Sequence, residues 1–237
     1  MEKLQQRLDE LLAQLRNEED VKERLSTLLS VYPFNRFEFI ISTLLGSGIL
    51  SLDGYYELRE DYIARNLYLY IFEISGPRTF GEAWAQGHLK ELIPDLVKPS
   101  KKIDPNYSGE YDFYLDGIRI EVKASRAVCF QTNEPLYVKA LSSDSEKQFD
   151  MNFQQIKPAC CHVFVWMGVW RDVIRHWVLN SKEVQSSKYY SGGQHRGNVD
   201  EGQLHLNRDN ISEFQTFEVK APELLNAIRK AYERQIA

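Results

Sequence analysis

The spacing of apolar side chains divides the chain near residue 100 into two parts of different character. Before that point apolar positions recur every three or four residues, which is typical of amphipathic helices. This spacing predicts helices over residues 4–15, 21–31, 37–45, 55–72 and 79–94. Short segments of glycine, serine and proline at 46–48 and 76–77 separate three of these helices.

After Pro99 the pattern changes to the alternation of apolar and polar residues that is typical of β-strands. Strands are predicted over residues 111–128, 162–169, 173–179 and 214–219. Between the first two, Phe149, Phe153 and Ile156 fall at helical spacing, which predicts a short helix that ends before Pro158. A closing helix is expected over residues 222–235, with a proline in its first turn.

Helices followed by strands predict the α+β class, in which a helical N-terminal part precedes a mixed β-sheet flanked by helices. We expect a helical region over residues 1–77 and a core over residues 78–237. Leucines at positions 4, 8, 11 and 15 have heptad spacing, which is also found where two chains pair. Packing of this helix on its own domain is the simpler interpretation, because the repeat covers only about two heptads.

Composition is that of an ordinary globular protein, with 43% hydrophobic and 27% charged residues. No apolar run reaches the length of a membrane span, and the N-terminus lacks the apolar core of a signal peptide. The three cysteines form neither a disulfide framework nor a CxxC pair. We therefore expect a cytoplasmic protein without a membrane partner.

The net charge of −5 restricts the ways in which the chain could bind nucleic acid. Residues 1–100 hold 11 Lys and Arg against 16 Asp and Glu, and the remainder holds 18 of each kind. A protein that coats DNA through charge alone is strongly basic. Any contact with DNA would need a local patch, with metal ions offsetting the carboxylates.

A predicted β-hairpin carries the most informative residues of the chain. Asp116-Gly117 between two alternating runs is a strong signal for a two-residue hairpin loop, and this loop fixes the register. One face is expected to be apolar, with the pairs Leu115–Ile118, Phe113–Ile120 and Tyr111–Val122. The other face is expected to pair Tyr114 with Arg119, Asp112 with Glu121, and Glu110 with Lys123.

The predicted register makes Asp112 and Glu121 cross-strand neighbours, with Cβ atoms about 5 Å apart. Two carboxylates at that distance destabilise a sheet unless a cation lies between them, and carboxylates are ligands that Mg²⁺ prefers. Lys123 is expected on the same face, where its charge can orient a water molecule and stabilise a phosphate. The alternative is a solvated hairpin face with incidental charges.

Asp112 followed by Glu121-Val122-Lys123 resembles the motif of the PD-(D/E)xK nuclease superfamily. The order of elements over about residues 78–180 is also similar, although Tyr111 stands where the name of the motif has proline. The resemblance implies a restriction-endonuclease-like core, in which Asp112 and Glu121 bind Mg²⁺ and Lys123 assists the attacking water. It also implies hydrolysis of DNA to 5′-phosphate and 3′-hydroxyl ends.

Within this superfamily, a stand-alone chain of 237 residues without a GxxxxGK[ST] signature resembles a type II restriction endonuclease. This implies sequence-specific cleavage of double-stranded DNA, no nucleotide cofactor, and a homodimer that cuts both strands. The helical N-terminal region would then serve dimerisation or clasp the DNA. The alternatives are a repair or junction nuclease of the same superfamily and a non-catalytic DNA-binding module.

Further candidates surround this motif, and each has a structural alternative. Glu82 is either an acidic group near the metal or a capping-box partner of Thr79. Glu110 is either a salt-bridge partner of Lys123 or a further acidic group at the metal. Gln154 and Gln155 are expected either to contact DNA or metal-bound water, or to form part of the polar face of a helix.

A recognition loop is expected around residues 186–205. It contains side chains of the types that read base edges, which an ordinary exposed loop contains as well. Arg126, just after the E-x-K strand, is a candidate for holding a phosphate. The candidate DNA-contacting residues are Arg126, Gln194, His195, Arg196 and Asn198.

Overall fold

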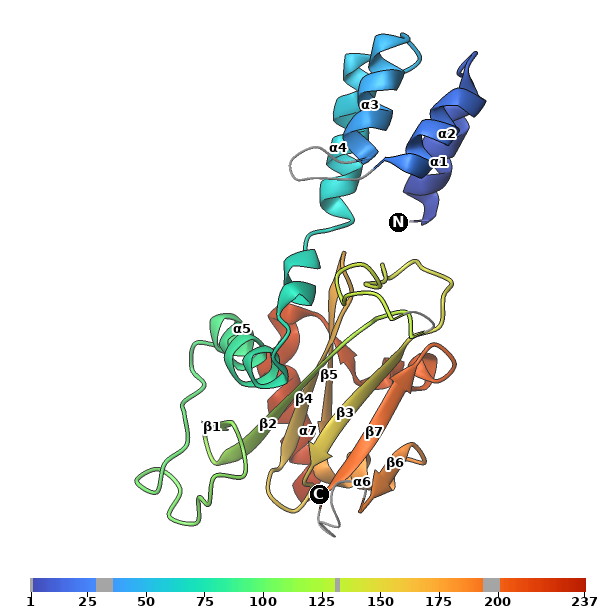
Figure 1. Ribbon diagram of the computed structural model, residues 1–237. Coiled ribbons are helices and arrows are strands. Elements are labelled where there is room, and N and C mark those ends of the chain that lie inside the picture. The colour runs from blue at the N-terminus through green and yellow to red at the C-terminus, as the bar shows by residue number, and fades with distance from the viewer. Residues whose placement is uncertain (1, 29–35, 131–132, 194–200) are drawn as a thin grey trace. The chain divides into compact units, whose positions relative to one another are not determined.

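The computed structural model describes residues 2–28, 36–130, 133–193 and 201–237 (Figure 1). The chain forms two compact units, Met1–Leu67 and Tyr68–Ala237. The division therefore falls earlier than the boundary that the sequence predicts after residue 77. The predicted α+β class is confirmed, with helices first and a mixed sheet afterwards. No helix among the described residues is long and apolar enough to cross a membrane.

The first unit is helical. Its helices within the described residues are α1 (Glu2–Leu12), α2 (Glu18–Thr27), α3 (Arg36–Gly46) and α4 (Leu52–Ala64). Leu4, Leu8 and Leu15 are buried in a core that includes Leu44 and Leu58, so the leucine stripe packs within its own unit. Ser51 begins α4, because its hydroxyl accepts a hydrogen bond from the Gly54 N–H at 3.0 Å.

Two of the predicted helices are interrupted. The helix expected over 55–72 ends at Ala64, and residues 69–73 form a separate 3₁₀ turn, η1 (Leu69–Glu73), in the second unit. Just after the end of α4, the Asn66 side chain donates to the Tyr62 carbonyl at 2.6 Å. The helix expected over 79–94 consists of a π-helical segment, η2 (Thr79–Ala85), followed by α5 (Gln86–Leu92).

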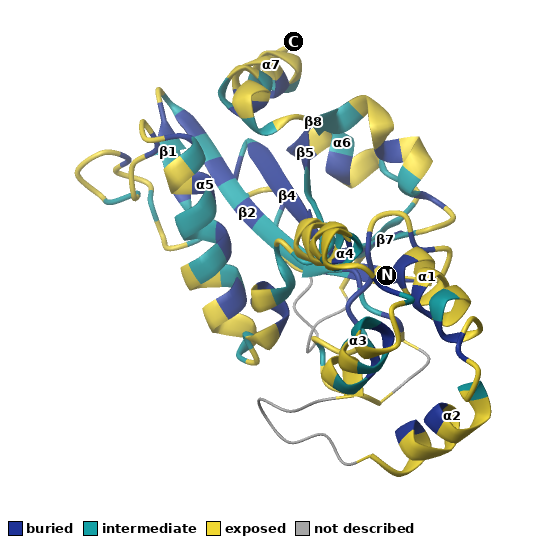
Figure 2. Cartoon of the chain, turned by 90° about the horizontal axis from the view of Figure 1, so that it is seen from above, coloured by how far each residue is buried: buried dark blue, intermediate teal, exposed yellow. Residues whose placement is uncertain are grey.

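The main sheet of the second unit has the order β1-β2-β4-β5-β8, in which β2 and β4 run parallel and the other neighbours antiparallel. Its strands are β1 (Phe113–Leu115), β2 (Ile118–Arg126), β4 (Val163–Val169), β5 (Ile174–Asn180) and β8 (Glu218–Val219). Every residue of β4 is buried, as expected for a central strand covered on both faces (Figure 2).

Different layers cover the two faces of the main sheet. Helices α5 and α7 (Leu224–Ile236) pack on one face, around Ile120 and Val165. A second sheet of order β3-β7-β6 packs on the other face, around Phe164 and Trp166. The strands of this second sheet are β3 (Asp150–Ile156), β7 (Gly202–Asn207) and β6 (Tyr190–Gly192).

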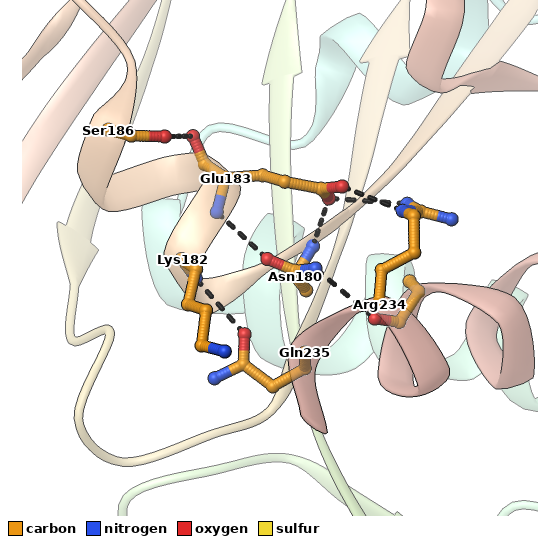
Figure 3. A network of polar contacts seen from close by, with 7 residues as sticks. Asn180, Lys182, Glu183, Ser186, Arg234 and Gln235 are labelled. Atoms are coloured by element: carbon orange, nitrogen blue, oxygen red, sulfur yellow. Dashed lines mark hydrogen bonds and ion pairs between the residues drawn. The ribbon is translucent and has the colours of Figure 1, made fainter. Parts of the chain in front are cut away.

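A polar network joins the C-terminal helix to the short helix α6 (Ser181–Ser186) (Figure 3). Asn180 and Glu183 form a capping box, in which each side chain accepts a hydrogen bond from the backbone N–H of the other, at 2.8 and 2.7 Å. Arg234 of α7 pairs with Glu183 at 2.7 Å, and Gln235 accepts from the Lys182 N–H at 3.1 Å. These contacts fix α7 against the sheet.

The hairpin follows the predicted register as far as Phe113–Ile120, and its apolar face is buried in the core. The ladder then ends, and the Asp112 N–H donates to the Ile120 carbonyl at 3.0 Å, so the predicted cross-strand pair of Asp112 with Glu121 is not formed, although their carboxyl groups still interact. Tyr111 consequently turns into the core on the opposite face of the sheet, where its hydroxyl donates to Asp104 at 2.8 Å. The prediction that Tyr111 faces Val122 was wrong, since the alternation stops where strand pairing stops.

The short helix predicted between residues 149 and 156 was also wrong, because this segment is strand β3. Phe153 pairs with Leu204 and Ile156 with Gly202, so two residues lie opposite one in a β-bulge. The bulge shifts the apolar alternation by one position. It thereby places Phe153 and Ile156 three residues apart, which imitates helical spacing. Residues 211–219, predicted as a strand from 214, form the 3₁₀ turn η3 (Ile211–Phe217) and the two-residue β8.

An aromatic column joins η2 and α5 to the main sheet. Phe80, Trp84 and His88, at four-residue spacing, stack with centroid distances of 5.3 and 5.4 Å, and His88 stacks on His176 of β5 at 6.0 Å. His176 is buried, and its Nε2 has no hydrogen-bond partner among the described residues. Burial, and secondarily the neighbouring His88, lowers the pKa of His176 to about 4.

Acidification is expected to destabilise the second unit through His176. The unfolded chain takes up the proton near pH 6.5, whereas the folded protein resists it down to about pH 4. The contribution is therefore complete above pH 6.5 and is lost as the pH falls toward 4, on the order of 3 kcal/mol. Urea titrations followed by circular dichroism at pH 7 and pH 4.5 measure it. The His176→Phe variant should lose less stability between these pH values; an equal loss contradicts the assignment.

Candidate active site

A cleft of about 780 Å³ lies in the second unit, between η2, the hairpin and strand β3. It brings together candidates that the sequence predicts from four separate segments. They are Glu82, Glu110, Asp112, Glu121, Lys123, Arg126, Gln154 and Gln155. The remaining candidates, Gln194, His195, Arg196 and Asn198, lie outside the described residues.

Glu121 and Lys123 alternate with buried apolar residues on β2 and so point to the same face of the sheet. The Lys123 Nζ lies 2.6 Å from the Glu121 Oε1, and the two side chains are only 16% and 14% exposed. Burial raises the pKa of Glu121 to about 7; Lys123 opposes this rise and the Asp112 carboxylate adds to it. A carboxyl group with such a pKa is typical of functional sites.

Asp112 is held at both of its carboxylate oxygens. Oδ2 accepts a hydrogen bond from the Val122 N–H at 2.8 Å, and Oδ1 accepts one from Gln86 Nε2 at 2.5 Å. Burial raises the pKa of Asp112 as well, although the Val122 N–H and Lys123 oppose the rise. The carboxylate is therefore oriented by the hairpin on one side and by α5 on the other.

Gln86 is a site residue that the sequence did not reveal. Its Oε1 accepts a hydrogen bond from Lys98, and its amide group donates to Asp112, so it links a lysine to the buried carboxylate. The sequence placed Gln86 on the upstream helix but could not tell which turn of that helix faces the hairpin. That choice depends on how α5 packs against Ile120 and its neighbours.

The structure places Glu82 at the cleft without joining it to the carboxylate pair. Its side chain pairs with Arg78 at 3.1 Å, and both side chains are exposed. The predicted capping box is absent, since Thr79 lies inside the helical segment and makes no capping hydrogen bond. Within the described ranges, no third His, Cys, Asp or Glu side chain completes a metal-binding group with Asp112 and Glu121.

Glu110 does not pair with Lys123, as the extended hairpin register predicted. It pairs instead with Lys157 at 2.9 Å, and Lys157 also contacts Glu201 at 3.0 Å. Hydrogen bonds to these two glutamates raise the pKa of Lys157. The physical reason is again the end of strand pairing at Phe113, which lets the chain before Asp112 leave the hairpin plane.

Two adjacent carboxylates of this kind suit a hard divalent cation. Mg²⁺ binds through one or two carboxylates and retains positions for water and phosphate oxygens. Asp112 and Glu121 supply this donor set, and the raised pKa of each shows that a positive charge between them would be stabilising. The residues present therefore fit Mg²⁺.

Arg126 provides a positive charge in the same cleft. Its guanidinium lies 4.1 Å from the Phe80 ring centroid, and Nη1 donates to the carbonyls of Ile71 and Ile74 at 3.1 and 2.7 Å. Burial lowers the pKa of Arg126, and no carboxylate pairs with it in the described part of the chain. A half-buried guanidinium without a counter-charge is favourable where an anion binds, and phosphate suits its geometry.

Comparison with protein-family models and with curated proteins found no match to this sequence. Conclusions about function therefore depend on the residues of the cleft. These residues combine a carboxylate pair that suits a metal ion, a lysine beside it, and an arginine placed for an anion. This combination suits the hydrolysis of a phosphate ester, in which the attacking water is activated and the charge on the phosphate is stabilised.

Proposed function

We propose that this protein is a Mg²⁺-dependent endonuclease that hydrolyses phosphodiester bonds of double-stranded DNA. The observation that carries the proposal is the convergence of Asp112, Glu121 and Lys123 in one cleft, as the resemblance to PD-(D/E)xK nucleases predicted. The anion site at Arg126 lies in the same cleft and supports a phosphate-containing substrate.

Each residue of the cleft has a role that its contacts suggest. Asp112 and Glu121 would hold Mg²⁺, which supplies a water of lowered pKa and neutralises charge on the phosphate. Lys123, now paired with Glu121, stabilises negative charge on the substrate and orients the attacking water. Gln86 and the Val122 N–H keep the Asp112 carboxylate in position, and Arg126 binds a phosphate of the substrate.

More specifically, we propose that the protein is a cytoplasmic type II restriction endonuclease. Such an enzyme leaves 5′-phosphate and 3′-hydroxyl ends and acts as a homodimer, because a two-fold site needs two active sites to cut both strands. The net charge of −5 favours it over a repair or junction nuclease that binds without regard to sequence. The intact Asp, Glu and Lys set favours catalysis over DNA binding alone.

Incubation with plasmid DNA and Mg²⁺ tests the proposal. Discrete fragments are expected with Mg²⁺, and none in the presence of EDTA, because the carboxylate pair needs the cation to act. A smear would indicate a nuclease without sequence preference. DNA that is shifted in a gel but remains uncut at every Mg²⁺ concentration would instead support the DNA-binding module.

A further inference from the structure

The three-stranded sheet β3-β7-β6 has one buried and one polar face. Met151, Phe153, Leu204 and Leu206 are fully buried or nearly so against the main sheet. The alternate positions carry mainly polar side chains, four of which are amides at or beside the cleft: Asn152, Gln154, Gln155 and Gln203. None of the residues in these three strands is Lys or Arg.

The β-bulge concentrates these amides at the mouth of the cleft. Gln154 and Gln155 together lie opposite the single residue Gln203, and both side chains are exposed. Gln155 has a φ of 55°, in the left-handed region, which glycine and to a lesser extent asparagine and aspartate adopt but which is uncommon for glutamine. Without the bulge one of the two glutamines would point into the core, so the strained backbone presents both of them to the cleft.

The neighbouring amides are oriented by contact with each other. Asn152 Nδ2 donates to Gln203 Oε1 at 3.1 Å across the two strands. The Asn152 Oδ1 is buried and has no hydrogen-bond partner among the described residues. A buried acceptor without a partner is costly, so the Asn152 side chain would gain a hydrogen bond if DNA binding shifted it and exposed this oxygen to a base donor.

We propose that this amide cluster (Asn152, Gln154, Gln155 and Gln203) reads base edges in the major groove of the DNA. The inference rests on the proposed function, since it takes double-stranded DNA as the substrate of the adjoining cleft. Amides suit bases because each carries a donor and an acceptor, the pair that adenine presents at N6 and N7. A surface that only held phosphates would instead need cations, which these strands lack.

The dimensions of the sheet agree with this partner. The four amides lie on two strands, β3 and β7, whose axes are about 4.8 Å apart, and the major groove, about 12 Å wide, admits a two-stranded ribbon. Alternate residues along a strand repeat at about 6.7 Å, close to the rise of two base pairs. Asn152 and Gln154 would therefore meet base pairs two steps apart, next to the bond that the cleft would hold.

The test uses a double variant that removes both exposed amides without adding strain. Gln154→Ala shortens one side chain, and Gln155→Gly removes the other where a φ of 55° favours glycine. Asn226→Ala is the control, because Asn226 is an exposed amide on α7, which covers the opposite face of the main sheet. Each full-length protein selects duplexes from a random pool in a gel shift without Mg²⁺. The bound duplexes are sequenced, and the most enriched ones are then offered for cleavage with Mg²⁺.

The wild-type protein and Asn226→Ala should enrich the same base motif. The double variant should lose preference at one or two positions by about tenfold or more, while its affinity for unselected DNA stays within about twofold. A purely structural role would weaken binding to all sequences equally and would overturn the inference. So would a wild-type protein that selects no motif, or a double variant that selects the wild-type motif. A selected motif that depends on the glutamines but is never cut would overturn the proposed function alone.

Discussion

The Asp112→Asn variant will cut plasmid DNA about a thousandfold more slowly than the wild-type protein. Asp112 is one of the two carboxylates that would hold Mg²⁺, and a neutral amide removes half of the negative charge that the cation needs. Asparagine has nearly the same shape as aspartate, so its oxygen can still accept the hydrogen bond from the Val122 N–H. The amide nitrogen cannot accept the hydrogen bond from Gln86, so an unchanged circular dichroism spectrum shows that the loss reports chemistry and not a change in folding.

Asp116→Asn is the matched control for this measurement. Asp116 lies in the turn of the same hairpin, outside the cleft, and makes an exposed ion pair with Arg229 at 3.0 Å. Its φ of 49° is a conformation that asparagine adopts readily. We expect this control to cut at the wild-type rate within about twofold, because exposed ion pairs contribute little to stability. Normal cutting by Asp112→Asn under the same conditions would show that the site assignment is wrong.

The Trp166→Ala variant will lose about 3 to 5 kcal/mol of unfolding free energy in the second unit. Trp166 is fully buried on β4, beside Lys123 of β2 in the parallel register. It stacks on Phe153 of β3 with centroids 5.0 Å apart and planes at 14°. This contact joins the two sheets, so its removal leaves a cavity directly behind one wall of the cleft.

Urea titration followed by circular dichroism measures this loss, and Trp166→Phe serves as the comparison. The indole N–H of Trp166 has no hydrogen-bond partner among the described residues, so phenylalanine gives up ring volume but no hydrogen bond. Trp166→Phe should therefore lose well under half as much stability as Trp166→Ala. If the alanine variant lost less than about 1 kcal/mol, the packing between the two sheets would not be what stabilises this unit.

Buried charged side chains in the cleft destabilise the folded protein. Burial raises the pKa of both Asp112 and Glu121, which means that each ionised group is destabilised by its surroundings. Arg126 is also half buried without a carboxylate partner in the described part of the chain. Buried charged side chains without full counter-charges are expected at a site where a bound cation and an anionic substrate would supply those counter-charges.

Local features of the sequence were sufficient to predict the hairpin turn and the strand pairs next to it. The Asp116-Gly117 turn joins strands that are adjacent in sequence, so it fixes their register without help from the rest of the fold. The prediction that Asp112 and Glu121 belong together needed nothing further. The predicted strand pairs beyond Phe113 were wrong, including that of Asp112 with Glu121, because the backbone there leaves the ladder and takes Glu110 to Lys157.

Strand β3 shows why the rest was not predictable. Its bulge changes the spacing of buried residues, and the bulge exists because β3 pairs with β7, some fifty residues later in the chain. Similarly, Gln86 reaches Asp112 only because α5 packs on the hairpin's apolar face. Contacts between distant segments depend on which apolar surfaces pack against each other. A single sequence gives little information about that packing.

The sequence by itself determined the α+β class, the hairpin register as far as Phe113–Ile120, and the closeness of the two acidic residues and the lysine, since each depends on residue type and short-range spacing. Only the tertiary structure decided what surrounds that pair. In the folded protein Gln86, and not Glu82, contacts Asp112. The Arg126 guanidinium lies over the Phe80 ring, and the bulge in β3 places Gln154 and Gln155 at the surface. The physical reason is that a turn sets geometry within a few residues, whereas the walls of a cleft are set by the burial of whole layers against each other.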